Sequence, residues 1–227
     1  MFSAKDYFDL KECPFPEIYD GLEYVWEAIP KIKDVLSGNI RPGIHSSVKI
    51  SPHTFIGDNV QIGANTVIQH GAVILGPAII GSDCEIRAGA YLRPCVIVGN
   101  GAILGNSCEF KNCFLHNEAN VPHFAYVGDS LLGYQAHLGA GVKISNVKLT
   151  YETVKVKNPE RVIDTGLIKF GAILGDKTDI GCNSVLNPGS MIGPESIVYP
   201  TSSWRGVLPA KHIAKLRQTY EVVQRKG

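Results

Sequence analysis

The sequence lacks the features that mark membrane proteins, nucleic-acid-binding proteins and nucleotide-dependent enzymes. It has no apolar run of 18 residues and no N-terminal stretch with the character of a signal peptide, so we expect a cytoplasmic protein without a membrane partner. Its 22 Lys and Arg residues nearly balance 21 Asp and Glu residues, which argues against a nucleic-acid partner. Walker, GxSxG and dinucleotide-binding motifs are also missing from the sequence.

The patterns that indicate disulfides or a metal site are missing as well. The six cysteines include no CxxC pair, and Cys84 and Cys108 fall at positions where a small inward-facing side chain is expected, so packing explains them. A zinc ion held between subunits by His116, His123 or His137 is the alternative. These histidines have neither a short ligand spacing nor accompanying carboxylates, and we expect no metal.

An apolar residue recurs at every sixth position from Ile44 to Phe110, and most of these residues are isoleucine. Four positions later comes a small or β-branched residue, as at Val48 and Thr54. Neither a helix with 3.6 residues per turn nor a strand with a period of two produces a strict period of six. A hexapeptide repeat does, and it predicts an all-β solenoid: a parallel β-helix in which residues 18 apart stack on successive coils.

The repeat sets the predicted domain boundaries. After one five-residue step beyond Val127 it resumes, and Ile168 to Val198 carry its last hexads, so we expect the β-helix to span 41–203. A charged segment at 147–167 breaks the hexads and is predicted to be an inserted, functional loop.

Two flanking segments read as helices. In residues 1–40 the apolar residues between Leu22 and Leu36 recur at intervals of three and four, with Pro30 expected to split or kink the helix and Gly38-Asn39 to end it. Residues 204–227 are predicted to form a C-terminal helix that begins near Pro209. Both segments are expected to cap the ends of the solenoid.

Arg93 and Lys111 occupy corner positions where glycine would be typical, and they are 18 residues apart. They should therefore project from the same corner on successive coils. Two cations this close repel each other unless an anion lies between them, and guanidinium with ammonium suits a phosphate. The simpler interpretation is two exposed basic residues with independent counterions.

His123 lies in the one stretch, 111–127, where the repeat loses its phase. Its ordinary pKa is close to neutral pH, which makes it a candidate general base. The alternative is a histidine that is merely packed or exposed.

Half of the chain, in order, resembles the acetyltransferase domain of the bifunctional sugar-1-phosphate nucleotidylyltransferase/amino-sugar-1-phosphate acetyltransferases. The similarity is strongest to the archaeal type and next to the bacterial glucosamine-1-phosphate acetyltransferase domain. The matching stretches are LRP (92–94), GNSCEFKN (105–112), VPHFAYVGDSLLG (121–133), HLGAGVKISN (137–146), RVIDTGLIKFGAILGD (161–176) and DIGCNSVLNPGSMIG (179–193). The resemblance implies a left-handed parallel β-helix, a homotrimer and acetyl-CoA as co-substrate.

The resemblance also implies roles for individual residues. His123 corresponds to the general base. The residues that correspond to those holding or placing the sugar phosphate are Arg93, Lys111, Tyr126, His137 and Asn146, with Asn146 also implied to help catalysis. Ala172 and Cys182 fall where relatives contact acetyl-CoA, largely through backbone atoms.

The chain departs from its relatives in three ways. His137 stands where they usually have asparagine, and VKLTY at 147–151 lacks their tyrosine or lysine, for which Lys148 or Lys155 are candidate substitutes. Residues 1–40 are too few for a nucleotidylyltransferase domain, so we expect a stand-alone acetyltransferase.

We therefore expect acetyl transfer to the amine of an amino-sugar 1-phosphate, for nucleotide-sugar synthesis. The alternatives are a non-catalytic trimer that binds sugar nucleotides or serves as a scaffold, and an acyltransferase acting on another small amine or hydroxyl.

Overall fold

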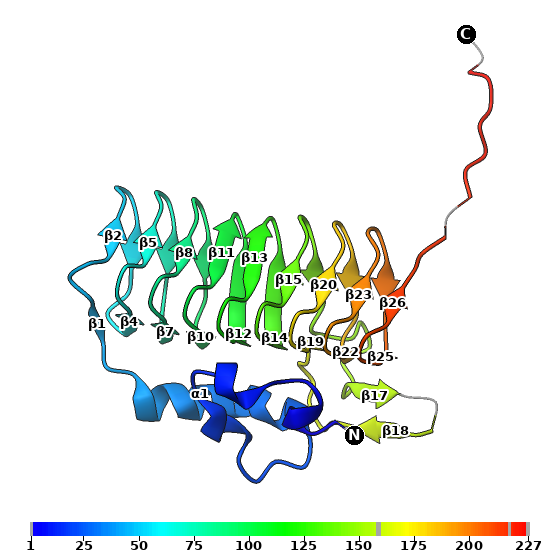
Figure 1. The fold of residues 1–227 in the computed structure, drawn as a ribbon, viewed down its shortest axis with the longest axis horizontal. Coiled ribbons are helices and arrows are strands. Elements are labelled where there is room, and N and C mark those ends of the chain that lie inside the picture. Colours follow the sequence, from blue (N-terminus) through cyan, green and yellow to red (C-terminus); the bar gives the residue numbers. More distant parts are fainter. Residues whose placement is uncertain (1, 158–159, 218, 226–227) are drawn as a thin grey trace.

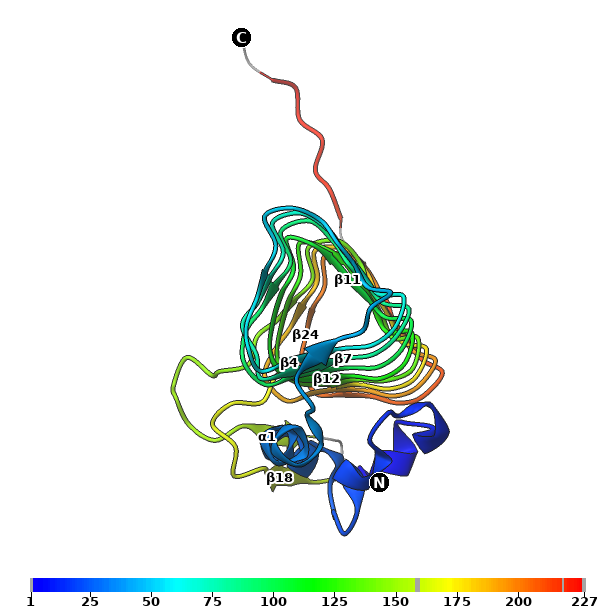
Figure 2. The same cartoon turned by 90° about the vertical axis from the view of Figure 1, so that its left-hand side faces the viewer.

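Most of the chain winds into a three-sided parallel β-helix, and the viewpoint along its axis shows the triangular cross-section (Figures 1 and 2). The computed structural model describes residues 2–157, 160–217 and 219–225. One side carries a single strand from each coil and contains nine strands. The hexapeptide β-helix predicted from the sequence is confirmed.

The three sides are named here in chain order as face 1, face 2 and face 3. Face 1 consists of β1 (Gly43–Ile44), β4 (Val60–Ile62), β7 (Ala78–Ile80), β10 (Val96–Val98), the ends of β12 (Glu109–Leu115) and β14 (Tyr126–Leu132), β19 (Ala172–Leu174), β22 (Ser190–Ile192) and β25 (Val207–Leu208). Face 2 consists of β2 (Lys49–Ile50), β5 (Val67–Ile68), β8 (Glu85–Ile86), β11 (Ile103–Asn106), β13 (Asn120–His123), β15 (His137–Leu138), β20 (Asp179–Ile180), β23 (Ile197–Val198) and β26 (Ile213–Ala214). Face 3 consists of β3 (Phe55–Ile56), β6 (Val73–Ile74), β9 (Tyr91–Leu92), the starts of β12 and β14, β16 (Lys143–Ile144), β21 (Val185–Leu186) and β24 (Ser203–Trp204).

The periodic apolar residues fill the inside of the prism. Ile68, Ile74, Ile86, Leu92 and Leu104 are all 0 % exposed. Each such side chain contributes about 1.5–3 kcal/mol by leaving water. A shift of one residue in register would turn every one of them outward, so the repeat fixes the register of each coil on the next.

The loss of phase around 111–127 has a simple structural cause. β12 and β14 each continue through the corner from face 3 to face 1, which joins these two faces into one 15-stranded sheet. Glu109 pairs with Tyr126 and Phe110 with Val127, so this coil is one residue shorter than 18.

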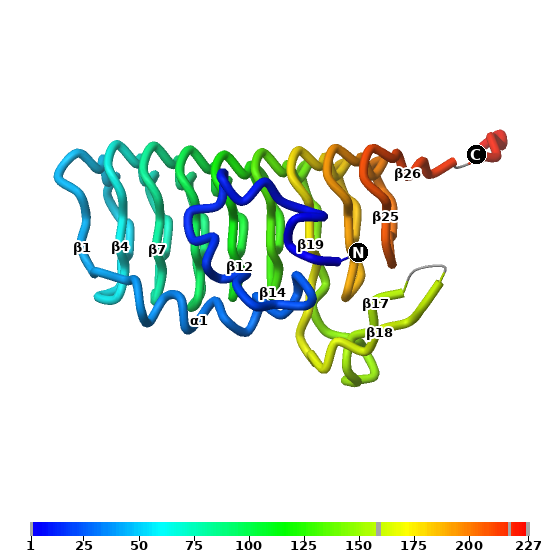
Figure 3. The backbone as a smooth tube through the Cα atoms, turned by 60° about the horizontal axis from the view of Figure 1, so that its bottom comes forward, coloured from blue at the N-terminus to red at the C-terminus, as the bar shows by residue number. Residues whose placement is uncertain are grey.

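Face 1 also carries an apolar ladder on its outer surface. The middle residues of its strands are paired in register, and they are Ile79, Ile97, Phe114, Leu131, Ile173 and Met191. All are buried, together with Trp26, Ile32 and Leu36 from the N-terminal segment. The N-terminal segment therefore lies along the side of the solenoid (Figures 1 and 3).

The prediction that residues 1–40 cap the end of the solenoid is wrong. The first coil is left open, because Ile44 is 45 % exposed and Ile50 is 47 % exposed. The N-terminal apolar side chains pack on face 1 instead, since its outer ladder offers a long apolar surface there.

The N-terminal segment contains one α-helix, α1 (Ala28–Asn39). We predicted that Pro30 would split or kink this helix, and it does neither. It lies in the first turn, where a missing backbone N–H costs no hydrogen bond. The predicted end at Gly38-Asn39 is confirmed. Short 3₁₀ turns precede the helix: η1 (Ala4–Asp6), η2 (Leu10–Glu12), η3 (Pro16–Tyr19) and η4 (Val25–Glu27).

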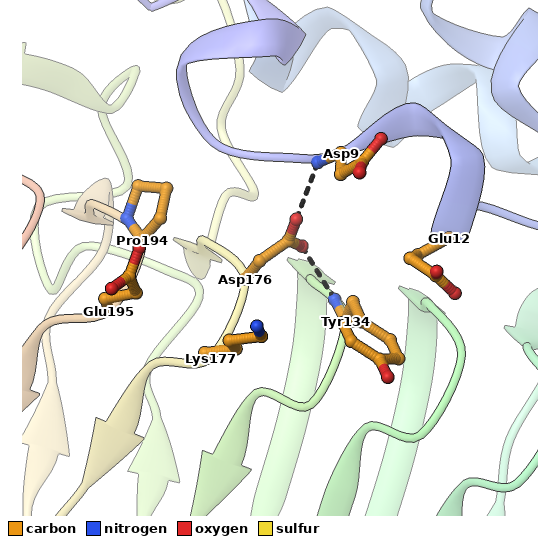
Figure 4. A pocket seen from close by; sticks show the side chains of 7 residues that line it. All are labelled: Asp9, Glu12, Tyr134, Asp176, Lys177, Pro194 and Glu195. Atoms are coloured by element: carbon orange, nitrogen blue, oxygen red, sulfur yellow. Dashed lines mark hydrogen bonds between the residues drawn. The ribbon is translucent and has the colours of Figure 1, made fainter.

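Polar side chains also help to hold this segment on the solenoid. The Tyr19 hydroxyl lies 2.9 Å from Nε2 of His116, a fully buried histidine between the rings of Phe8 and Phe114. Asp176 accepts the backbone N–H of Asp9 at 2.6 Å and that of Tyr134 at 2.8 Å, so its carboxylate bridges the segment and a corner of the solenoid (Figure 4).

The predicted C-terminal helix is also wrong. The repeat continues through β24, β25 and β26, and residues 215–217 and 219–225 are described without a helix. Ile192 pairs with Leu208 and Val198 with Ala214, so the last coil is two residues shorter than 18. Of the apolar residues that suggested a helix, Ile213 lies in β26, and Leu216, Tyr220 and Val223 follow the last strand.

The inserted segment leaves the solenoid after Asn146 and rejoins it at Phe170, whose N–H donates to the Asn146 carbonyl at 2.9 Å. We predicted that Ile168 belongs to the repeat, and this is wrong: its side chain is 53 % exposed. The insertion contains a hairpin of β17 (Lys155–Lys157) and β18 (Val162–Asp164). It lies beside the N-terminal segment (Figure 1).

We expect acid to weaken the attachment of the N-terminal segment. Burial lowers the pKa of His116 to about 3 from an ordinary value of 6.5. Below pH 6.5 the released state, in which this histidine is exposed, therefore binds more protons than the attached state. The free energy that favours attachment falls by about 1.4 kcal/mol per pH unit between pH 6.5 and the lowered pKa of about 3. Fluorescence of Trp26, which is 1 % exposed, would report release in a Trp204→Phe background.

His116→Phe removes this titration and should flatten the pH dependence, whereas the exposed His70→Gln should leave it unchanged. Burial raises the pKa of Asp176, an effect of opposite sign that is common to all variants and cancels in the comparison. Equal pH midpoints for the wild type and His116→Phe would contradict the assignment.

Candidate active site

The corner between face 3 and face 1, called here the 3–1 corner, stacks polar residues from successive coils. Leu92 pairs with Phe110, so Arg93 and Lys111, which follow them, occupy neighbouring coils about 4.8 Å apart. Lys111 in turn pairs with Gly128. The structure thus places both cations in one column.

Each of these cations has a carboxylate partner. Arg93 Nη1 lies 2.8 Å from Glu109 Oε1, and the two side chains are 38 % and 37 % exposed. Lys111 Nζ lies 3.3 Å from Asp129 Oδ2. Separate counterions, the simpler interpretation of the sequence, thus describe this structure, and a phosphate bound here would compete with the two carboxylates.

Asp129 organises the 3–1 corner, and the sequence analysis missed its role. It is 3 % exposed and accepts hydrogen bonds from the side-chain amides of Asn112, at 2.8 Å, and of Asn146. Its φ of 47° is a left-handed value that aspartate tolerates better than most residues. The signal available in the sequence was an acidic residue placed directly after the corner glycine Gly128.

Tyr126 extends from face 3 toward the same corner. Its hydroxyl lies 2.6 Å from the position that a Cβ on Gly128 would occupy, and Asn146 Nδ2 lies 2.9 Å from it, so only glycine leaves room for both groups. Burial raises the pKa of Tyr126, and the Asp129 carboxylate raises it further. The phenol is therefore a hydrogen-bond donor at neutral pH.

His123 lies at a different corner, between face 2 and face 3, called here the 2–3 corner. It pairs with Asn106, five positions before Lys111, which places it roughly 16 Å along face 3 from the lysine backbone. The His123 ring lies beside that of Phe124, which is 58 % exposed. Within the described part of the chain, no side chain hydrogen-bonds to the ring, so both nitrogens are accessible.

Cys182 shares the 2–3 corner with His123. His137 pairs with Asn120 and Asp179, so the residues three positions later, His123, Ala140 and Cys182, form one column over three coils. Gly139 lies against this column, since a Cβ there would be 2.7 Å from the backbone nitrogen of Cys182. Small residues therefore lie between His123 and the exposed Cys182 on this corner.

The remaining two predicted residues lie elsewhere. His137 is on the outside of face 2, where its Nδ1 lies 2.9 Å from Asp179 Oδ1. Ala172 is 0 % exposed inside face 1, and its N–H donates to the Ser130 hydroxyl at 3.0 Å. Neither its side chain nor its N–H can therefore contact a cofactor on the surface, and its position does not support the predicted contact with acetyl-CoA.

The structure therefore separates two chemical environments. The 3–1 corner offers cations, amides and a phenol, which suit a phosphorylated polyol, and the 2–3 corner offers an accessible imidazole. Among the residues described, no group of three or more His, Cys, Asp or Glu side chains could hold a metal ion. The helices described are too short or too polar to cross a bilayer.

Comparison with known proteins gives two family matches. Residues 74–169 match the GMPPB C-terminal domain, and residues 41–76 match the bacterial transferase hexapeptide family of six repeats. Together these matches cover residues 41–169, which include the residues named above at the two candidate corners except Cys182.

The chain is also similar to individual proteins. It is 36 % identical to the putative uncharacterized acetyltransferase YaiX of Escherichia coli (strain K12) over 79 % of this chain and 82 % of that protein. It is 34 % identical to the bifunctional sugar-1-phosphate nucleotidylyltransferase/acetyltransferase of Sulfurisphaera tokodaii, over 40 % of this chain and 22 % of the relative. It is 38 % identical to the bifunctional protein GlmU of Methanococcus maripaludis (strain C7), over 76 % of this chain and 43 % of the relative.

Asp129→Asn should destabilise the protein by about 1–3 kcal/mol, because one amide oxygen cannot replace a buried carboxylate that serves Lys111 and two amides. Asparagine tolerates the left-handed backbone, so the loss would report the carboxylate. Urea unfolding measures it. The control is Glu109→Gln, which breaks the exposed pair with Arg93 and should cost at most about 1 kcal/mol. Equal losses in the two variants would show that Asp129 does not organise the corner.

Proposed function

This chain belongs to the hexapeptide-repeat acetyltransferase family, and we propose that it transfers the acetyl group of acetyl-CoA to the amine of an amino-sugar 1-phosphate. The observation that supports this acceptor is the 3–1 corner, where Arg93 and Lys111 lie on neighbouring coils. Guanidinium binds phosphate through two parallel hydrogen bonds, and the ammonium adds a point charge. Tyr126 and Asn146, beside them, suit the hydroxyl groups of a sugar.

His123 is proposed as the general base. The amine of the acceptor must be neutral to attack, so the imidazole takes a proton from nitrogen as the new C–N bond forms. The thioester C–S bond then breaks, and the imidazolium returns a proton to the thiolate of CoA. Backbone N–H groups of the 2–3 corner are proposed to stabilise the oxyanion of the tetrahedral intermediate.

This chemistry requires a second copy of the chain. His123 and the phosphate-binding cations lie at opposite edges of face 3 within one chain, too far apart to act on one small acceptor. Face 1 is covered by the N-terminal segment, which leaves faces 2 and 3 for assembly. We therefore propose a homotrimer in which His123 of one subunit meets Arg93 and Lys111 of its neighbour.

The two kinds of residue should separate kinetically. His123→Ala should lower kcat by roughly 10²–10⁴-fold, because positioned proton transfer contributes that much. Arg93→Ala and Lys111→Ala should mainly raise KM for the phosphorylated sugar, since phosphate does not react. Release of free CoA with a panel of amino-sugar phosphates measures both constants.

An acetylation rate in His123→Ala equal to that of the wild type would rule out the base. Binding of sugar nucleotides without any CoA release by the wild type would favour the non-catalytic scaffold.

Mixing inactive variants tests the shared site. His123→Ala co-expressed in equal amounts with the double variant Arg93→Ala/Lys111→Ala should regain activity, because about a quarter of the sites between subunits then carry both intact halves. The readout is CoA release at a sugar concentration below KM. A mixture no more active than the two separate variants would place the site within one chain. Sedimentation of the wild type as a monomer would contradict the proposed trimer.

A further inference from the structure

A second group of cations surrounds a pocket of ≈ 230 Å³ between the inserted segment and the last coils. The charged groups that line it are Lys148, Lys155, Lys157, Arg205 and Glu152. Lys148 Nζ pairs with Glu152 Oε2 at 3.0 Å. Within the described ranges, the other three cations have no carboxylate partner, although Lys155 lies opposite Asp164 in the hairpin. The four cations and one carboxylate that line the pocket therefore sum to a net charge of +3, and Asp164 lies close enough to Lys155 to share its field.

The hairpin fixes two of these charges in place. Val154 and Val156 are each 1 % exposed and pack into the apolar cluster under the N-terminal segment. Because side chains alternate along a strand, burying these two valines turns Lys155 and Lys157 together to the other side of β17. The lysines are thus held by the same apolar cluster that attaches the N-terminal segment.

Gly189 allows the hairpin to lie against the solenoid. A Cβ on Gly189, whose φ is +78°, would lie 2.6 Å from Val154 Cγ1. Gly206 lies next to the carbonyl oxygen of Lys157, 3.6 Å from the position that a Cβ on the glycine would occupy. These contacts bring the lysines to the corner that carries Arg205.

Arg205 belongs to the same column as the proposed sugar-phosphate site. Strand pairings run from Lys111 to Gly128, then through β16 and β21 to β24, which Arg205 follows. These four coil steps correspond to roughly 19 Å. A neighbouring pocket of ≈ 350 Å³ is lined by both Arg205 and Ser145, the residue before Asn146, so a hollow extends from Arg205 toward the segment that carries Asn146.

We propose that Lys155, Lys157 and Arg205 bind the diphosphate of a nucleoside diphosphate group. A guanidinium and two ammonium groups, none in a direct ion pair with a carboxylate within the described ranges, match two adjacent phosphates. The choice of ligand rests on the proposed function, which offers two sources: the 3′-phosphoadenosine diphosphate of CoA, or the nucleoside diphosphate of an acceptor that carries a whole nucleotide in place of a single phosphate.

Calorimetric titration of the full chain with CoA and, separately, with UDP distinguishes the sources. Lys157→Gln/Arg205→Gln should raise Kd by roughly 10- to 100-fold for the nucleotide that occupies the pocket. Loss confined to CoA identifies the donor as the ligand, loss confined to UDP identifies a nucleotide-linked acceptor, and loss of both supports the shared chemistry. Gly189→Ala should weaken the same binding without removing a charge, because it displaces the hairpin.

The control is Lys49→Gln/Lys177→Gln, which removes two positive charges from other parts of the surface. Unchanged binding in Lys157→Gln/Arg205→Gln, an equal loss in the control, or no binding of either nucleotide to the wild type would each overturn the proposal. Binding is measured without turnover, so a wild type that binds nucleotide but acetylates no sugar phosphate would refute the proposed function and leave the pocket standing. Trp26 fluorescence verifies that each variant keeps its folded N-terminal segment.

Discussion

The stacking register of the coils is the constraint on which the rest of the structure depends. Because inward apolar residues fix each coil on the next, the position of any residue around the prism follows from its place in the repeat. Arg93, Lys111 and Gly128 fall in one column, and His123 with Cys182 in another, although they come from different coils. The register thus assembles both candidate corners without any long-range side-chain pairing, and Asp129 then fixes the side chains at one of them.

The covered face decides which surfaces remain available for function. Phe114 and Leu131 give face 1 an apolar exterior that the N-terminal segment buries, and the valines of the inserted hairpin join the same cluster. One apolar cluster therefore attaches both the N-terminal segment and the hairpin to the solenoid. By burying the valines of the hairpin, it also determines the direction in which the lysines of β17 point. Faces 2 and 3 and their shared corner, where His123 lies, stay open to a neighbouring subunit.

The sequence predicted the interior and the corners well because a period of six reports inward positions directly. Prediction from the sequence failed where the apolar residues do not recur with a period of six. The outer ladder of face 1, Ile79 to Met191, recurs only once per coil and at unequal intervals wherever a coil is shortened. The apolar residues from Ile213 to Val223 also imitated a helical stripe, although residues 215–217 and 219–225 are described without a helix. The partners of Asp129 could not be predicted either, because three side chains from two separate segments, Lys111 with Asn112 and Asn146, converge on it only after the coils have stacked.

Because the solenoid rises by a constant distance per coil, residues along the 3–1 corner are spaced at fixed intervals. Any two groups on this corner are separated by a whole number of coils, so their spacing changes only in steps of about 4.8 Å. The spacing between Lys111 and Arg205 therefore cannot be changed by small adjustments of the backbone between them. A change in this spacing requires the insertion or deletion of one complete coil. Such a change leaves the other coils intact, because each coil contacts only its neighbours.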